Sequence, residues 1–175
     1  MSIISEILVV VPARGGSKRV KNKNIRLINN KPMIKWTLNE LMKVIDKNKI
    51  IISTDDEKTK RIVEEVGLKV PFTRPAEISD DFTPTQDVAK HALNWYEKNN
   101  SKIKYTLIIY PTAILLKHVD LLHAYNFMKK NSSCSVFFTA GQFSHPIERA
   151  FRLDNKKQFK MINPNFYKKR TQDFE

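Results

Sequence analysis

At 175 residues, with 41% hydrophobic and 28% charged residues, the chain has the size and composition of one globular domain with a hydrophobic core. Its longest apolar runs are far too short to span a bilayer, so we expect no membrane partner. Cys134 is the single cysteine, which excludes an internal disulfide, and the N-terminus lacks a signal-peptide pattern; both features favour the cytoplasm.

The net charge of +13 at pH 7 makes nucleic acid a partner to consider. Much of the excess lies in two acid-free stretches, residues 14–31 and 155–172. Single-strand binders interleave basic residues with aromatic ones on which bases stack, but no Phe, Tyr or Trp lies between Ser2 and Trp36. A basic nucleic-acid-binding module is therefore an alternative that the sequence disfavours.

Short β-rich runs alternate with stretches of helical periodicity, which is typical of βαβ units. We expect four strands: 6–11, 49–53, 106–110 and 135–139. The strand at 106–110 is expected to be central in the sheet, and 69–72 to be a short extended piece. We expect four helices: 32–45, 57–66, from Pro84 or Thr85 onward, and 119–128. A hairpin around Asp154–Asn155 is expected over 151–159, followed by an irregular basic segment.

This pattern predicts an α/β fold, a three-layer sandwich with a mostly parallel, Rossmann-like sheet. Residues 1–175 are expected to be a single domain in which 141–175 form a hairpin extension. Polar residues follow the ends of the strands at 12–16, 54–56 and 110–112, while the strand bodies stay apolar. Because parallel strands end at the same edge of a sheet, we expect a binding crevice there.

The loop after the first strand is the most informative segment. It contains Gly15 and Gly16, two of only four glycines, and seven basic side chains between positions 14 and 31: Arg14, Lys18, Arg19, Lys21, Lys23, Arg26 and Lys31. Glycine lets backbone N–H groups approach an anion, and cations offset its charge. The loop matches neither the Walker A pattern nor the dinucleotide GxGxxG pattern, so it predicts a different phosphate site.

Several motifs in order resemble the CMP-sugar-acid synthetases, the cytidylyltransferases that activate sialic and related nine-carbon acids. The resemblance covers nearly the whole chain and is carried by these segments: 11–19, 23–25, 31–34, 52–57, 70–77, 81–87 and 170–173. Tyr110-Pro111-Thr112 and residues 143–147 resemble most closely the branch that uses pseudaminic acid, because sialic-acid enzymes usually carry glutamine at the position of Tyr110. The resemblance implies a fold of the nucleotide-diphospho-sugar transferase type and a homodimer, with 134–167 as the contact segment.

The resemblance also implies the chemistry. The anomeric hydroxyl of the sugar acid attacks the α-phosphate of CTP, which releases pyrophosphate and needs no protein nucleophile. Arg14 and Lys23 would be catalytic, and the nucleotide would bind to Gly15, Gly16, Ser17, Asn24, Arg74, Asp81 and Thr83. The acidic sugar would contact Tyr110, Thr112, Arg170 and Gln172.

Magnesium is the cofactor that the resemblance implies. Family members run further than Glu175 and carry the acidic metal ligands there, so the metal-binding residues are unknown from this sequence. A nucleotide-binding remnant without turnover is therefore a second alternative. Asp55 and Asp56 are equally consistent with a site role and with capping the next helix, and the four histidines form no metal-binding set.

Overall fold

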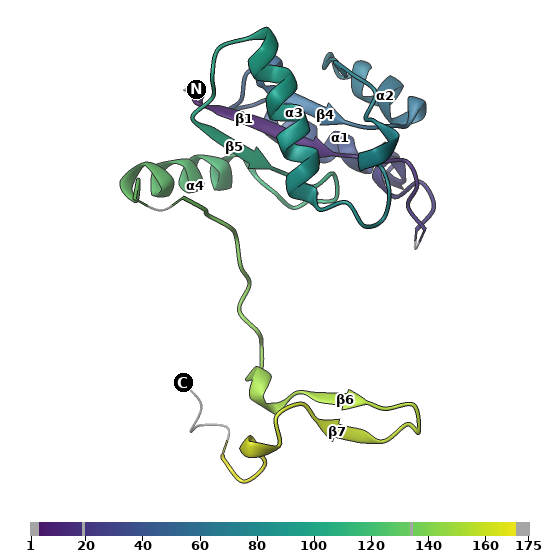
Figure 1. Ribbon diagram of the computed structural model, residues 1–175, viewed down its shortest axis with the longest axis vertical. Coiled ribbons are helices and arrows are strands. Elements are labelled where there is room, and N and C mark those ends of the chain that lie inside the picture. Colours follow the sequence, from purple (N-terminus) through teal and green to yellow (C-terminus); the bar gives the residue numbers. More distant parts are fainter. Residues whose placement is uncertain (1–3, 19, 134, 171–175) are drawn as a thin grey trace. The chain divides into compact units, whose positions relative to one another are not determined.

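The computed structural model describes residues 4–18, 20–133 and 135–170, and the chain divides into two compact units after Asn131. The first unit is built on a parallel sheet of three strands: β1 (Ile7–Pro12), β4 (Ile50–Ser53) and β5 (Tyr105–Ile108). The strand order is β4-β1-β5, with Val9 opposite Ile50 on one side and Leu107 on the other. β1 is therefore the central strand, with β4 on one side and β5 on the other (Figure 1).

Helices cover both faces of this sheet (Figure 1). Val9 and Val11 of β1 pack in one apolar cluster with α1 (Met33–Leu41), α2 (Glu57–Glu64) and α4 (His118–Lys130). Leu8 and Val10 point the other way and pack against α3 (Thr85–Asn99). Alternate residues of a strand face opposite sides of the sheet. A continuous apolar run therefore has apolar side chains on both faces, and helices on both sides bury it as the middle layer. The prediction of a three-layer α/β sandwich with a parallel sheet is confirmed.

Short elements connect these layers. The loop after β1 contains a 3-10 turn at Lys23–Ile25, and the small strands β2 (Leu27–Ile28) and β3 (Lys31–Pro32) pair before α1. Pro32 precedes the first turn of α1. At this position a backbone N–H would have no partner within the helix, so the N–H that proline lacks is not missed. Gly67 follows α2 with φ of +76°, a conformation that glycine adopts without strain.

Two expectations about strands were wrong. Residues 105–108 lie at an edge of the sheet, not at its centre, since the described part of β5 pairs with β1 alone. Residues 135–139 form no strand, and Val136 and Phe138 are exposed, so no packed layer stabilises an extended conformation there. Residues 69–72, expected as a short extended piece, belong to no helix or strand and lead to an isolated bridge between Thr73 and Thr54.

The second unit is a hairpin with short turns around it. β6 (Phe151–Leu153) pairs antiparallel with β7 (Phe159–Met161), which confirms the predicted hairpin. The Asp154 carboxylate accepts hydrogen bonds from the backbone of Lys156 and Gln158, at 2.9 and 3.0 Å, and so shapes the turn. Within the described part of the chain, no helix has the length and apolar content needed to cross a bilayer.

Candidate active site

The loops that follow the three parallel strands meet at one edge of the first unit. Pro12 at the end of β1 lies opposite Ser53 at the end of β4, and the backbone N–H of Ala13 donates to the Ser53 carbonyl at 2.8 Å. β1 has one neighbour on each side, so the loop after it lies where the strand order changes direction. In open α/β sheets this is the place where ligands bind.

Gly15 interlocks with the loop after β4. Its backbone N–H donates to the Asp55 carboxylate at 2.8 Å, and a Cβ at this position would lie 2.7 Å from the Cβ of Asp56. Only glycine fits so close an approach. Gly16 is different, because a Cβ there would meet nothing within 4 Å. The two adjacent glycines therefore serve different purposes, the first in packing and the second in leaving its backbone open to solvent.

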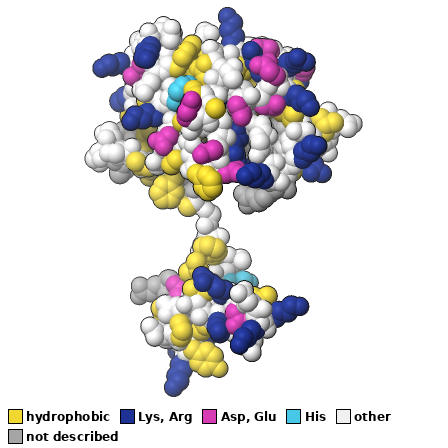
Figure 2. All heavy atoms as spheres, turned by 45° about the vertical axis from the view of Figure 1, so that its right-hand side comes forward, with side chains coloured by type: hydrophobic (Ala, Val, Ile, Leu, Met, Phe, Trp, Pro, Cys, Tyr) yellow, Lys and Arg dark blue, Asp and Glu magenta, His cyan; other side chains and the backbone are white. Residues whose placement is uncertain are grey.

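The cations of this loop are partly neutralised by one carboxylate. Arg14 donates to Asp81, and Lys18 Nζ lies 2.5 Å from the other Asp81 oxygen. These two partners, Lys18 first, lower the pKa of Asp81 to about 2. Acidic and basic side chains also alternate over the face of the first unit drawn in Figure 2, rather than forming a continuous basic surface.

Asn24 and Lys23 sit in the 3-10 turn of the same loop. Asn24 is 6% exposed, and its side-chain amide donates to the Arg14 carbonyl at 2.9 Å, which holds the loop in place. Ser17 closes a tight turn through its N–H and the Gly15 carbonyl. No carboxylate pairs with the half-buried Lys23 among the residues described, so its ammonium is available to an anion.

Arg74 is turned into the protein. Its Nε donates to Ser53 Oγ at 3.0 Å and its guanidinium to the Ser53 carbonyl at 2.5 Å, and only 5% of the residue is exposed. Burial lowers its pKa, opposed by the nearby Asp55. Arg74 therefore secures the end of β4 and the loop that carries Asp55.

The remaining predicted residues are only partly brought together. Thr83 bonds to Asp80 in the loop that also holds Asp81, and Tyr110 shares a hydrogen bond of 3.1 Å with Thr85 at the start of α3. Thr112 is exposed beside Pro111. Arg170 belongs to the second unit, and Gln172 lies outside the described residues.

Sequence reasoning left two features of this edge unresolved or unseen. Asp56 is a helix cap, since its carboxylate accepts from the N–H and hydroxyl of Thr59 at 2.9 and 2.6 Å. The hydroxyl of Thr37 donates to the Pro111 carbonyl at 3.0 Å and ties α1 to the loop after β5. No signal in the sequence indicates this bond, because a threonine within a helix looks the same whether or not a distant loop needs it.

The described residues do not fit a magnesium site. No group of three or more His, Cys, Asp or Glu side chains among them is arranged to hold a metal ion. The carboxylates near the loop are already engaged, Asp55 by Gly15, Asp56 by Thr59 and Asp81 by two cations. A magnesium ion bound by the protein would need ligands beyond these three.

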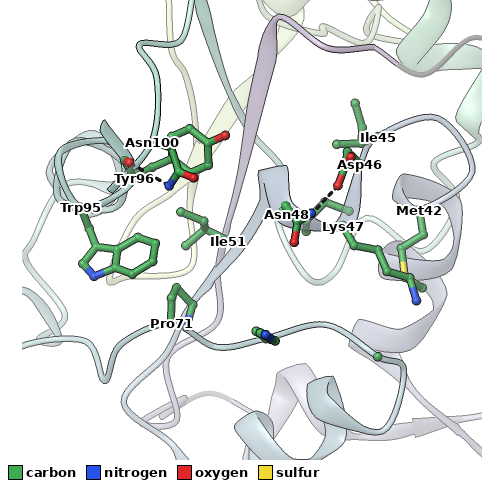
Figure 3. Close-up of a pocket in the computed structure, with 13 residues that line it drawn as sticks. Met42, Ile45, Asp46, Lys47, Asn48, Ile51, Pro71, Trp95, Tyr96 and Asn100 are labelled. Atoms are coloured by element: carbon green, nitrogen blue, oxygen red, sulfur yellow. Dashed lines mark hydrogen bonds between the residues drawn. The ribbon is translucent and has the colours of Figure 1, made fainter. Parts of the chain in front are cut away.

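A cavity of the first unit lies away from this edge. It has a volume of about 700 Å³ and lies between the start of β4, the end of α3 and residues 67–71. Ile51, Trp95 and Pro71 line one part, and Asp46 and Lys47 line another (Figure 3). None of the predicted site residues line this cavity. We place the candidate anion site at the loop after β1, because the loop has the positive charge and the open backbone that an anion needs.

The fold and this edge define a class of protein: an α/β nucleotide-binding protein whose basic, glycine-containing loop follows the central strand. The cytidylyltransferase family model matches residues 8–170. The chain therefore belongs to the cytidylyltransferase family, which confirms the predicted family of nucleotidyltransferase enzymes.

Individual relatives support the same assignment. The chain is 34% identical to the pseudaminic acid cytidylyltransferase of Campylobacter jejuni, over 95% of this chain and 71% of the relative. It is 33% identical to the N-acylneuraminate cytidylyltransferase of Escherichia coli, over 53% of this chain and 22% of the relative. A solved CMP:2-keto-3-deoxy-manno-octonic acid synthetase complexed with CTP shares the fold, with a TM-score of 0.58 and 21% identity over 74% of this chain and 49% of its own.

Proposed function

We propose that this protein transfers CMP from CTP to a nine-carbon nonulosonic acid, and that the acid is pseudaminic acid. The anomeric hydroxyl of the sugar acid attacks the α-phosphorus of CTP and loses its proton to solvent. The bond from the α-phosphorus to the oxygen bridging to the β-phosphorus breaks, and pyrophosphate leaves with that electron pair. The similarity to the Campylobacter jejuni enzyme over 95% of this chain supports the choice of sugar. The chain spans about half the length of the solved synthetase, so the activity of the whole protein is part of the proposal.

One observation carries the proposal: a cationic loop with an open glycine follows the central strand of a parallel sheet. Phosphoryl transfer needs positioned donors and cations more than a protein nucleophile, because charge is spread over the phosphate oxygens in the transition state. Arg14 and Lys23 supply that charge, while Gly16 and Ser17 offer donors beside them. Gly15 and Asn24 act indirectly, by holding the loop against Asp55 and against the Arg14 carbonyl.

The other roles follow from neighbouring loops. Asp81 and Thr83 lie on the loop that reaches Arg14, and they would face the ribose and cytosine of CTP. Arg74 would support the nucleotide through the end of β4, to which it is bonded. Tyr110 and Thr112 would contact the sugar acid from the loop after β5, with Arg170 and Gln172 as further contacts.

Magnesium belongs to the proposal as the cofactor that offsets charge on the phosphates. The described carboxylates are not arranged as a site that would hold the ion on the protein. A homodimer formed through residues 134–167 and a cytoplasmic location complete the proposal.

The test is pyrophosphate release from CTP and Mg²⁺ with a panel of sugar acids. We expect release with pseudaminic acid and much less with sialic, legionaminic or eight-carbon acids. CTP binding by calorimetry without release from any acid would favour a nucleotide-binding remnant. Salt-sensitive binding of single-stranded DNA that is tighter than CTP binding would overturn the proposal in favour of a nucleic-acid module.

A further inference from the structure

Asp81 pairs with two cations of the basic loop, Lys18 and Arg14, and Arg14 is one of the two proposed to bind the triphosphate. Its two carboxylate oxygens are divided between Arg14 and Lys18, and Arg14 is held further by the Ser79 carbonyl at 3.5 Å. Both partners come from the loop after β1, whereas Asp81 comes from the loop before α3, more than sixty positions away. The contact therefore joins two separate loops of the proposed site.

The neighbouring carboxylate has a different task. Asp80 accepts from the backbone N–H groups of Phe82 and Thr83, at 3.0 and 2.7 Å, and from the Thr83 hydroxyl at 2.7 Å. These bonds build the turn locally, so the shape of the loop depends on Asp80. Among the described residues the Asp81 side chain contacts only Arg14 and Lys18, and breaking these contacts would leave the Asp80 turn intact.

Charge balance gives this contact a consequence. Arg14 and Lys18 carry two positive charges and Asp81 one negative charge, so the group presents a net single positive charge to an incoming anion. A bare polyphosphate must compete with the carboxylate for both cations and then lies beside an unpaired negative charge. A nucleoside triphosphate also brings ribose hydroxyls, which can donate to the released carboxylate.

We infer that Asp81 is a specificity-determining residue: it weakens the binding of bare polyphosphates, the product pyrophosphate included, relative to the nucleoside triphosphate. The inference rests on the proposed nucleotide site and adds a means by which that site separates substrate from product. When the nucleotide enters, Asp81 exchanges Arg14 and Lys18 for sugar hydroxyls. After transfer, Asp81 competes with pyrophosphate for the same cations and favours its release.

The test compares the isosteric substitution Asp81→Asn with Glu64→Gln, which makes the same change in net charge on an exposed position of α2. Dissociation constants for inorganic pyrophosphate and for CTP are measured by calorimetry in one buffer. We expect Asp81→Asn to tighten pyrophosphate binding about tenfold, the scale of a charge-assisted contact, and CTP binding much less. Glu64→Gln should change both by less than about twofold.

Equal pyrophosphate affinities in Asp81→Asn and Glu64→Gln would overturn the inference, as would an equal gain for pyrophosphate and CTP. Failure of the unsubstituted protein to bind CTP is a separate result, and it overturns the proposed function instead. Thermal unfolding of each variant verifies its folding, and Asp81→Ser replaces Asp81→Asn if the asparagine variant does not fold. The same two affinities then decide the outcome.

Discussion

Residues 4–131 bury both faces of their central strand, whereas the strands of residues 132–170 keep large apolar side chains in solvent. Val9 and Val10 of β1 are 0% exposed, while Phe151 of β6 and Phe159 of β7 are 54% and 75% exposed. The first unit has a core of its own, and none of the described residues of the second unit is buried. The contacts that shape the glycine loop, from Gly15 to Asp55 and from Arg14 to Asp81, lie within the first unit.

The buried core of the first unit and the exposed strands of the second predict different responses to mutation. The described contacts that stabilise the sheet and shape the glycine loop lie within the first unit. The strands of the second unit expose large apolar side chains, which fits the proposed role of this unit in a dimer. Matched substitutions in the two units test this difference.

Leucine-to-alanine substitutions should differ sharply between the units. Leu38 in α1 is 0% exposed, and Leu38→Ala should cost about 2–5 kcal/mol of unfolding free energy, because it leaves a cavity in the core. Leu153 in β6 is 55% exposed, and Leu153→Ala should change the free energy of unfolding by less than about 0.5 kcal/mol. Urea unfolding measures both. Equal losses would mean that the second unit has an apolar core of its own.

Removal of a loop cation should impair turnover. Arg14→Ala and Lys23→Ala should each cost about 2–4 kcal/mol of transition-state stabilisation, as expected when a donor to a charged transition state is lost. Lys160→Ala is the matched control in the second unit, where Lys160 pairs with Asp154 at 3.0 Å. The measurement is kcat/KM for pyrophosphate release. Unchanged kcat/KM in both Arg14→Ala and Lys23→Ala would show that this loop does not hold the triphosphate.

The two glycines of the loop should respond unequally to a methyl group. Gly15→Ala places a Cβ 2.7 Å from the Cβ of Asp56, so backbone has to shift, at a cost of about 1–3 kcal/mol in stability. Gly16→Ala meets no atom within 4 Å and should cost less. Thermal unfolding of the two variants measures both losses of stability. A larger effect at Gly16 would argue against the close contact between the loop and Asp56.

The smallest expected effect depends on pH. Glu40 in α1 bonds to Lys43 and to His118 at the start of α4, and these contacts, Lys43 first, lower its pKa from 4.5 to about 2. A depressed carboxylate pKa stabilises the fold above pH 4.5, and this stability is lost as pH falls toward 2. Glu40→Gln should therefore cost about 1 kcal/mol at pH 7, the scale of a hydrogen bond to a charged group, and almost nothing near pH 2.

Urea midpoints measured across this pH range make the comparison. Glu64→Gln, on the exposed side of α2, should show no such pH dependence. A constant difference between Glu40→Gln and the unsubstituted protein at all pH values would mean that packing, not charge, accounts for the cost.

Much of the fold was predictable because it follows from local periodicity. The apolar run before Pro12, the helical spacing in 32–45 and the turn residue Asp154 are local signals. The structure agrees with the first and the third, and it forms the predicted helix over Met33–Leu41, a shorter range than expected. The strand expected at 135–139 failed for the opposite reason. Its pattern suits a strand, but a strand also needs a partner and a layer to pack on, and Val136 and Phe138 have neither among the described residues.

Sequence alone determined the order of the layers, the basic loop at the end of the first strand and its resemblance to cytidylyltransferases, since each is written in neighbouring residues. Only the tertiary structure decided how the loop is used. In the folded protein Asp81 pairs with Arg14 and Lys18, the Gly15 N–H donates to the Asp55 carboxylate, and Arg74 donates to Ser53. These contacts join residues 21 to 67 positions apart, and whether such side chains meet depends on how the layers pack, which no local pattern records.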